Sequence, residues 1–167
     1  AGTAVAALRE LGFGQAEAAA AMTGVEWPAR MQRLRRGPLV AAAAGCELWL
    51  DGGHNPAGGQ AVASTLAELP PRPTHLICGM LNTKDVGGYL RALAPQVETL
   101  TAVSIAGEAA TLSAEDTAAF ARDAGIPAST APDVAQAVAA LAADHPGARL
   151  LICGSLYLAG RVLRENA

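Results

Sequence analysis

The sequence is poor in lysine. Its 167 residues include one lysine, Lys84, beside 11 arginines, and 12 cations against 15 acidic residues leave a net charge of −3. A P-loop needs a lysine between glycine and serine or threonine, whereas Lys84 stands in Asn82-Thr83-Lys84-Asp85. The chain therefore carries no P-loop, and any nucleotide chemistry here must do without the lysine that usually holds the phosphates.

Long apolar runs and aromatic residues are also scarce. No run approaches the ~20 residues of a membrane-spanning helix, and the first residues do not show the pattern of a secretory signal. The sequence has two Phe and two Trp, and its charge balance is weakly acidic. Neither a membrane protein nor a nucleic-acid-binding surface is expected from this composition.

Cysteine and histidine are few and widely spaced. Three cysteines, an odd number without a C-x-x-C pair, favour buried, reduced thiols of a cytoplasmic protein over a disulfide or zinc framework; they are Cys46, Cys78 and Cys153. No histidine has a partner four residues away, so no metal site is predicted in this chain; the three are His54, His75 and His145.

What the sequence has in abundance is alanine. There are 40 alanines and 46 larger apolar residues, enough for a packed core in one domain of this length. The first 25 residues predict two short helices, Thr3–Leu11 and Gln15–Met22, which bury little by themselves. We expect residues 1–25 to be the tail of a preceding domain with its linker.

From Trp27 onward, short apolar runs alternate with helical segments. Strands are predicted at Glu47–Leu50, His75–Cys78, Thr99–Ile105, Ala128–Thr130 and Leu150–Cys153. Helices are predicted at Pro56–Leu69, Val86–Ala94, Ala114–Ala124, Asp133–Ala143 and Leu156–Arg164. A further strand, Leu39–Ala43, is expected to form a hairpin with Glu47–Leu50. This alternation predicts an α/β fold: a Rossmann-like, open, mostly parallel sheet with one antiparallel strand and helices on both faces.

In such a sheet the binding crevice lies at the carboxyl ends of the strands. The first segment there is Asp51-Gly52-Gly53-His54-Asn55-Pro56. The glycines permit a tight turn, and Asn55 and Pro56 suit the start of a helix, whose free N–H groups favour an anion. A purely structural turn would explain the glycines, but it accounts poorly for both Asp51 and His54.

Two more segments end strands at the same edge. Lys84 and Asp85 follow Cys78, where a solvated loop with a local ion pair is an equally good interpretation. Ser155 follows Cys153 and either caps the last helix or donates to a carboxylate. Upstream, Arg30 suits bidentate contact with a phosphate, although it also lies in a basic stretch that could be a solvated surface.

Four motifs occur in order and together resemble one known family. They are W-P-A-R-M-Q-R-L from Trp27, L-D-G-G-H-N-P from Leu50, G-M-L-N-T-K-D from Gly79 and G-S-L-Y-L-A-G from Gly154. The set resembles the C-terminal domain of folylpolyglutamate synthase/dihydrofolate synthase, within the Mur ligase superfamily. Two small-for-small departures, Ala29 where the family often has Gly and Gly53 where it has Ala, affect loop details only.

The resemblance implies an ATP-dependent ligase of folate biosynthesis that adds L-glutamate to dihydropteroate or folates through an acyl phosphate. A P-loop and metal sites, with Mg, are implied in domains that would precede residues 26–167. Residues 1–25 resemble the helices that close the central ATPase domain. The isolated chain is then expected to be inactive, with its ATPase domain, ATP, L-glutamate and the pterin or folate as partners.

The resemblance also implies roles for individual residues. Arg30 resembles the arginine that reaches the ATP phosphates, and Asp51 resembles the residue that holds the ribose. His54 is placed near the transferring phosphate and the glutamate, in a catalytic and a substrate-binding role, and Ser155 near the glutamate carboxylate. The roles of Asn55, Lys84 and Asp85 are left open.

Three other functions compete with this interpretation. A Mur ligase for cell-wall precursors would use the same chemistry on a different acceptor. A non-catalytic module that binds a nucleotide or amino acid would suit the short chain, but not Arg30, His54 and Ser155 in the family's spacing. A dinucleotide oxidoreductase would need G-x-G-x-x-G after a strand, which is missing in that register.

Overall fold

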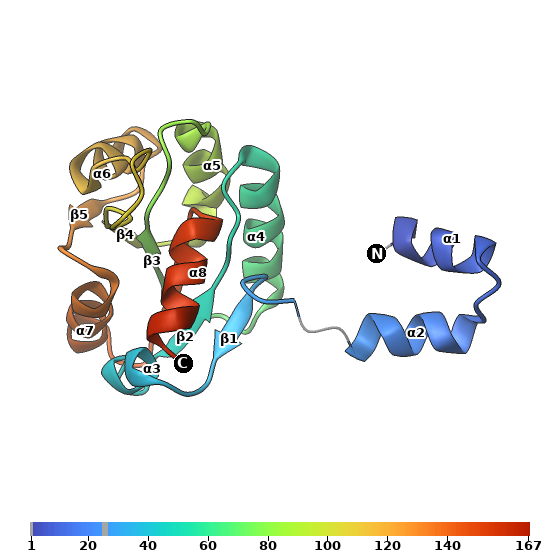
Figure 1. The fold of residues 1–167 in the computed structure, drawn as a ribbon. Coiled ribbons are helices and arrows are strands. Elements are labelled where there is room, and N and C mark those ends of the chain that lie inside the picture. The colour runs from blue at the N-terminus through green and yellow to red at the C-terminus, as the bar shows by residue number, and fades with distance from the viewer. Residues whose placement is uncertain (1, 25–26) are drawn as a thin grey trace.

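The computed structural model describes residues 2–24 and 27–167, and its centre is a six-stranded sheet (Figure 1). The strand order is β1-β2-β6-β3-β4-β5. Their bounds are β1 Gln32–Leu34, β2 Glu47–Leu50, β3 Thr74–Cys78, β4 Thr99–Ala102, β5 Ala128–Thr130 and β6 Arg149–Cys153. Strand β1 pairs antiparallel with β2, and every other pairing is parallel. The predicted fold class is confirmed.

Helices cover both faces of the sheet, and two apolar clusters fill the space beneath them. One cluster joins α3, α7 and α8 to the sheet, and the other joins α4, α5 and α6. Neighbouring residues of β3 alternate between them, with Leu76 in the second cluster and Ile77 in the first. Because β3 and β6 are buried along their whole length, they are the apolar centre of the fold.

The helices begin where the sequence places their caps. Their bounds are α1 Gly2–Glu10, α2 Gln15–Gly24, α3 Pro38–Ala42, α4 Pro56–Glu68, α5 Val86–Leu93, α6 Ala114–Asp123, α7 Val134–Asp144 and α8 Leu156–Glu165, with a 3₁₀ turn at Ala94–Gln96. Ser113 Oγ accepts the N–H of Asp116 at 2.9 Å, as its capping motif predicts. Asp133 caps α7 in the same way through the N–H of Gln136, at 2.8 Å.

The predicted hairpin strand Leu39–Ala43 is wrong, because this segment is the short helix α3. Gly37 takes a positive φ of 101° and Pro38 occupies the first helical turn, a pairing that starts a helix. The N–H of Leu39 donates to Asn166 Oδ1 at 2.9 Å, from the far end of the chain. The antiparallel partner of β2 is instead β1, which was not predicted to be a strand.

The remaining predicted elements differ only at their ends. Helices α1 and α2 confirm the helical start and are drawn to one side of the sheet in Figure 1. Strand β4 ends at Ala102 rather than Ile105, although the N–H of Val103 still bonds the carbonyl of Cys78 at 2.9 Å. Among the helices of residues 2–24 and 27–167, none is long and apolar enough to cross a membrane.

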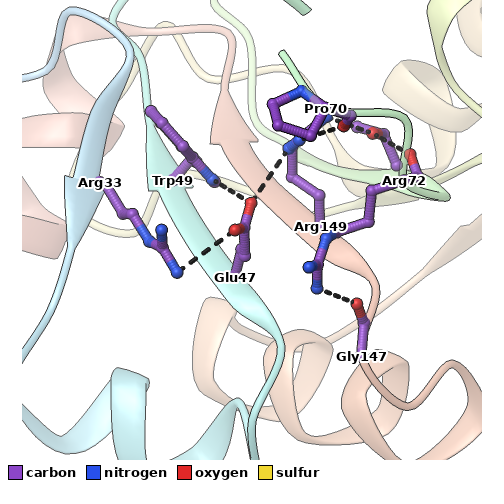
Figure 2. Close-up of polar contacts among 8 residues, drawn as sticks. Arg33, Glu47, Trp49, Pro70, Arg72, Gly147 and Arg149 are labelled. Atoms are coloured by element: carbon purple, nitrogen blue, oxygen red, sulfur yellow. Dashed lines mark hydrogen bonds and ion pairs between the residues drawn. The ribbon is translucent and has the colours of Figure 1, made fainter.

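A buried ion network ties the amino ends of the strands together (Figure 2). Arg149 of β6 is 3% exposed and reaches Glu47 Oε2 of β2 at 3.4 Å and the carbonyl of Pro70 at 3.0 Å. Arg33 reaches the other oxygen of Glu47 at 3.3 Å, and the indole N–H of Trp49 donates to Glu47 Oε2 at 3.2 Å. Partial burial alone would raise the pKa of Glu47, but the Trp49 N–H and the surrounding guanidinium groups hold it below its usual value.

Two histidines meet at the same amino-terminal edge. The rings of His75 and His145 stack with centroids 3.9 Å apart. His75 is fully buried, and its Nδ1 lies 2.8 Å from Thr99 Oγ1. Burial and the neighbouring His145 lower the pKa of His75, and Glu98, with Oε2 4.0 Å from Nε2, only partly opposes them. Both histidines lie at the opposite end of the strands from the site described next.

Candidate functional site

Three loops converge at the carboxyl ends of β2, β6 and β3, as the parallel pairing predicts. Leu50 of β2 is in register with Ile152 of β6, and Cys78 of β3 is in register with Cys153. Each of these strands then runs directly into one of the predicted site segments, which contain Asp51 to Asn55, Gly79 to Asp85, and Gly154 to Ser155. The prediction that Asp51, His54 and Ser155 share one sheet edge is confirmed.

Asp51 is buried and holds two backbone segments together. Its Oδ2 accepts the N–H of Met31 at 2.8 Å, and its Oδ1 accepts the N–H of Gly53 at 2.6 Å. The carboxylate therefore joins the segment that carries Arg30 to the loop that carries His54. Each carboxylate oxygen has a second lone-pair direction, so Asp51 can still accept a hydroxyl from a ligand.

Arg30 projects from a strained turn. Its neighbours Ala29 and Met31 both take positive φ, at 55° and 41°, which non-glycine residues seldom adopt. The turn is held by the N–H of Gly52, which donates to the carbonyl of Ala29 at 2.8 Å, and by the Asp51 bond to Met31. Arg30 itself is exposed, and its Nη1 donates to the carbonyl of Ala29 at 2.9 Å.

Gly52 is closely packed by two side chains. A Cβ atom at this position would collide with the side chain of Leu156 and would lie 2.9 Å from Arg30 Nη1. The close backbone approach that the sequence predicts in this turn is therefore present at Gly52. It lets the start of α8 and the Arg30 turn meet over the end of β2.

Two cavities open at this edge, and His54 lines both. The first has a volume of about 390 Å³ and is lined by Arg30, Asp51, His54 and the start of α4. The second has a volume of about 270 Å³ and is lined by His54, Lys84 and Ser155, with Thr83 and Tyr157. The structure thus brings the predicted residues together and divides them between two adjacent spaces.

His54 is oriented by the backbone. Its Nδ1 lies 3.0 Å from the carbonyl oxygen of Gly52. Because a carbonyl can only accept, Nδ1 carries the proton, and Nε2 is the nitrogen left to accept a proton or to bind a ligand.

Ser155 is confirmed as a helix cap, and Asn55 and Asp85 act in the same way. Ser155 Oγ accepts the N–H of Tyr157 at 3.1 Å, and its side chain is 2% exposed. Asn55 Oδ1 accepts the N–H of Gly58 at 2.8 Å, and Asp85 Oδ1 accepts the N–H of Gly88 at 2.8 Å. Three helices thus direct their N-termini toward this edge, where their free N–H groups favour anions. A serine hydroxyl that accepts one bond still has a proton to donate.

Tyr89 of α5 was not predicted, although it supports the loop of the site. Its ring lies under the loop, so a Cβ on Gly53 would be 3.5 Å from Cε2 and one on Gly59 would be 3.1 Å from Cδ2. Burial, together with the nearby Cys153 and Cys78, raises its pKa far above the usual value. Nothing in the sequence pattern distinguishes Tyr89 from an ordinary core residue of a helix.

The two thiols beneath the site are buried, as predicted, whereas Cys46 is only partly buried. The pKa of the Cys78 thiol is raised well above its usual value, first by its hydrogen bond with Cys153 and then by burial. Cys78 therefore behaves as a small apolar side chain at neutral pH. Thr83 and Tyr157, which line the smaller cavity, lie inside motifs that the sequence already singled out.

The fold and the site together define an α/β domain with two adjacent cavities at the carboxyl edge of its sheet, where three helix N-termini favour anions. The model of the family described as "Mur ligase, glutamate ligase domain" matches residues 29–156. This match covers most of the chain, and the chain belongs to that family.

Relatives of known name are enzymes of folate metabolism. The chain is 29% identical over 136 residues to folylpolyglutamate synthase of Lacticaseibacillus casei, a match that covers 81% of this chain and 29% of the relative. It is 37% identical over 82 residues to dihydrofolate synthase/folylpolyglutamate synthase of Mycobacterium tuberculosis, covering 48% of this chain and 15% of the relative. A cell-wall ligase is accordingly not favoured.

Solved structures agree. M. tuberculosis folylpolyglutamate synthase complexed with ADP and AMPPCP matches with a TM-score of 0.74 and 29% identity, covering 93% of this chain and 36% of that one. E. coli FolC in complex with DHPP and ADP matches with a TM-score of 0.81 and 25% identity, covering 97% and 37%. The chain spans about a third of the length of the proteins it matches.

Proposed function

We propose that this chain is the C-terminal domain of an ATP-dependent ligase that adds L-glutamate to dihydropteroate or folates through an acyl phosphate. The observation that carries the proposal is His54 standing between the two cavities. One cavity holds the residues expected to contact a nucleotide, and the other holds those expected to contact an amino acid. A ligase that couples phosphoryl transfer to attack by glutamate needs these two ligands side by side.

The larger cavity is assigned to the nucleotide. Arg30, exposed at its rim, would contact the phosphates with its planar guanidinium, and Asp51 would accept a ribose hydroxyl. The strained turn that presents Arg30 is held at both ends by hydrogen bonds, so the guanidinium is directed toward the cavity before a ligand arrives. When bound, ATP supplies the phosphoryl group that activates the acceptor carboxyl.

The smaller cavity is assigned to glutamate. Ser155 would donate its hydroxyl proton to a glutamate carboxylate, aided by the N-terminus of α8, and Lys84, which lines the same cavity, would supply a positive charge. His54 lines both cavities, and its Nε2 would hold a proton between the phosphate and the incoming amine.

Magnesium is expected to be held mainly by the domains that would precede this one. Across residues 2–24 and 27–167, no group of three or more His, Cys, Asp or Glu side chains is placed to hold a metal ion. We therefore assign no metal ligand here. On this proposal residues 26–167 form the ligase domain, residues 1–25 belong to a preceding ATPase domain and its linker, and the protein acts in the cytoplasm.

The glutamate assignment is tested by Ser155→Ala in the full-length ligase. We expect the KM for glutamate to rise more than about threefold, equivalent to ~0.7 kcal/mol, while the KM for ATP stays unchanged. Ser113→Ala is the matched control, because Ser113 caps α6 through the same type of bond but lines neither site cavity. A change below threefold, or an equal change in the control, would show that Ser155 is only a helix cap.

A further inference from the structure

A third cavity, separate from the glutamate site, lies along the edge strand β1. It has a volume of about 740 Å³, larger than either site cavity, and Trp27 stands at its rim with 68% of its surface exposed. Four arginines line it, namely Arg30, Arg33, Arg35 and Arg36. Residues 30–36 contain no acidic side chain, although the whole chain has a net charge of −3. We name this cavity the arginine groove.

The wall of the arginine groove is fixed rather than loose. Asn166 is buried at its far end, where Nδ2 donates to the carbonyl of Arg36 at 2.9 Å and Oδ1 accepts the N–H of Leu39 at 2.9 Å. A Cβ on Gly37 would collide with Asn166, so this stretch is packed tightly against the end of α8. A binding surface that is already ordered loses less entropy when a ligand arrives.

Most of the positive charge in the groove is unpaired. Arg33 reaches Glu47 at 3.3 Å, but that carboxylate is shared with Arg149. In the part of the chain that the structure describes, no ion pair involves Arg30, Arg35 or Arg36. Three exposed arginines that are in no ion pair among the described residues therefore line one cavity.

We propose that the arginine groove binds an extended polyanion, a flexible chain of closely spaced carboxylates or phosphates. Arg30 lies in the turn before β1, Arg33 on the strand, and Arg35 and Arg36 after it, so the charges are spread along the groove. Several linked anions can contact these arginines together, whereas a single carboxylate or phosphate contacts only one or two of them. Because Arg30 also lines the larger site cavity, a chain bound in the groove extends toward the nucleotide pocket.

Arginines on an edge strand have a simpler role, since charge there discourages edge-to-edge pairing between molecules. That role requires exposed charge on β1, but it requires neither a cavity nor a wall fixed by Asn166. The two roles therefore make different predictions about ligand binding and about self-association.

The test is calorimetric titration of the 167-residue chain with tripolyphosphate and with penta-γ-glutamate, each beside its monomer. We expect at least one of the two polyanions to bind far more tightly than inorganic phosphate or glutamate, and its affinity to fall as the salt concentration is raised. Arg35→Ala/Arg36→Ala should weaken binding about tenfold or more, which corresponds to ~1.4 kcal/mol. Arg91→Ala/Arg122→Ala changes the net charge equally on helices α5 and α6 and should leave binding unchanged.

If only one of the two polyanions binds, the groove is selective for that type of anion, carboxylate or phosphate. If both bind, the groove recognises the spacing of charge. The proposal would be overturned if a polyanion and its monomer bound with equal affinity, or if the control variant lost as much binding as Arg35→Ala/Arg36→Ala. It would also be overturned if only Arg30→Ala reduced binding. Absence of binding by both polyanions would also overturn it, and self-association of the double variant would then favour the simpler edge-strand role. Arg35→Lys/Arg36→Lys, which keeps the charge and should keep most of the binding, guards against a variant that fails to fold.

Discussion

At the scale of single residues, the site depends on side chains that serve the backbone and the ligand together. Asp51 accepts two N–H groups from segments 20 and 2 residues away, and Ser155 caps α8 while it lines a cavity. Such residues are expected to affect both stability and binding when they are changed. Denaturation measures the effect on stability, and ligand affinity measures the effect on binding.

Asp51→Ala is predicted to lower the free energy of unfolding by about 2 kcal/mol. The substitution removes the acceptor of two buried N–H groups, and bonds to a charged group contribute more than neutral ones. Urea denaturation of the variant and the parent chain measures the difference. Asp144→Ala, at the surface end of α7, should change stability by less than ~0.5 kcal/mol. Equal effects at the two positions would remove the structural role of Asp51.

At the scale of elements, the amino-terminal edge is held by charge and the carboxyl edge by helix caps. Arg149 joins β6 to β2 and to the loop before β3, while Arg33 reaches the same Glu47 from the exposed edge strand (Figure 2). Glu47 therefore pairs with one buried arginine, Arg149, and with one exposed arginine, Arg33, so the two ion pairs can be compared.

Arg149→Ala is expected to cost about 3 kcal/mol of stability, because it leaves Glu47 partly buried without its inner partner. Arg33→Ala should cost less than ~1 kcal/mol, since exposed ion pairs contribute little. Thermal or urea unfolding of both variants compares them directly. If Arg33→Ala lowered the free energy of unfolding more than Arg149→Ala, the network would mainly stabilise the edge strand β1 and not the core.

The elements also show where sequence reasoning succeeds. Helix α4 was predicted because Asn55 and Pro56 are local start signals, and the site edge followed from parallel pairing of the strands. The segment Leu39–Ala43 was misassigned because five apolar residues have no decisive period. Its helical state depends on Asn166, 127 residues away, and on a positive φ at Gly37, neither of which is visible locally. Tyr89 was missed for the same reason, since its role is defined only by the loop packed on it.

At the scale of the whole molecule, the stacked histidines couple stability to pH. The pKa of His75 is lowered from 6.5 in the folded chain by burial and by His145, with Thr99 and Glu98 as its other polar neighbours. The unfolded chain therefore binds more protons than the folded chain just below that value. Stability is full above pH ~6.5 and is lost as the pH falls from there.

Urea unfolding between about pH 7 and pH 5 should accordingly show a decreasing free energy of unfolding toward acid. His75→Asn, which keeps a polar atom near Thr99 but does not titrate, should flatten this slope. His54→Asn, at the opposite edge, should retain it. A slope that persists in His75→Asn would assign the effect to other groups.

The direction of β1 has a consequence for how this domain is connected. Because β1 is antiparallel to β2, the chain enters the sheet at the same edge where the two site cavities open. Arg30 lies only two residues before that strand. In a longer chain of this family, whatever precedes residue 27 is tethered beside the cavities and not at the opposite edge. On the proposed function, this connection raises the effective concentration of the preceding ATPase domain at Arg30.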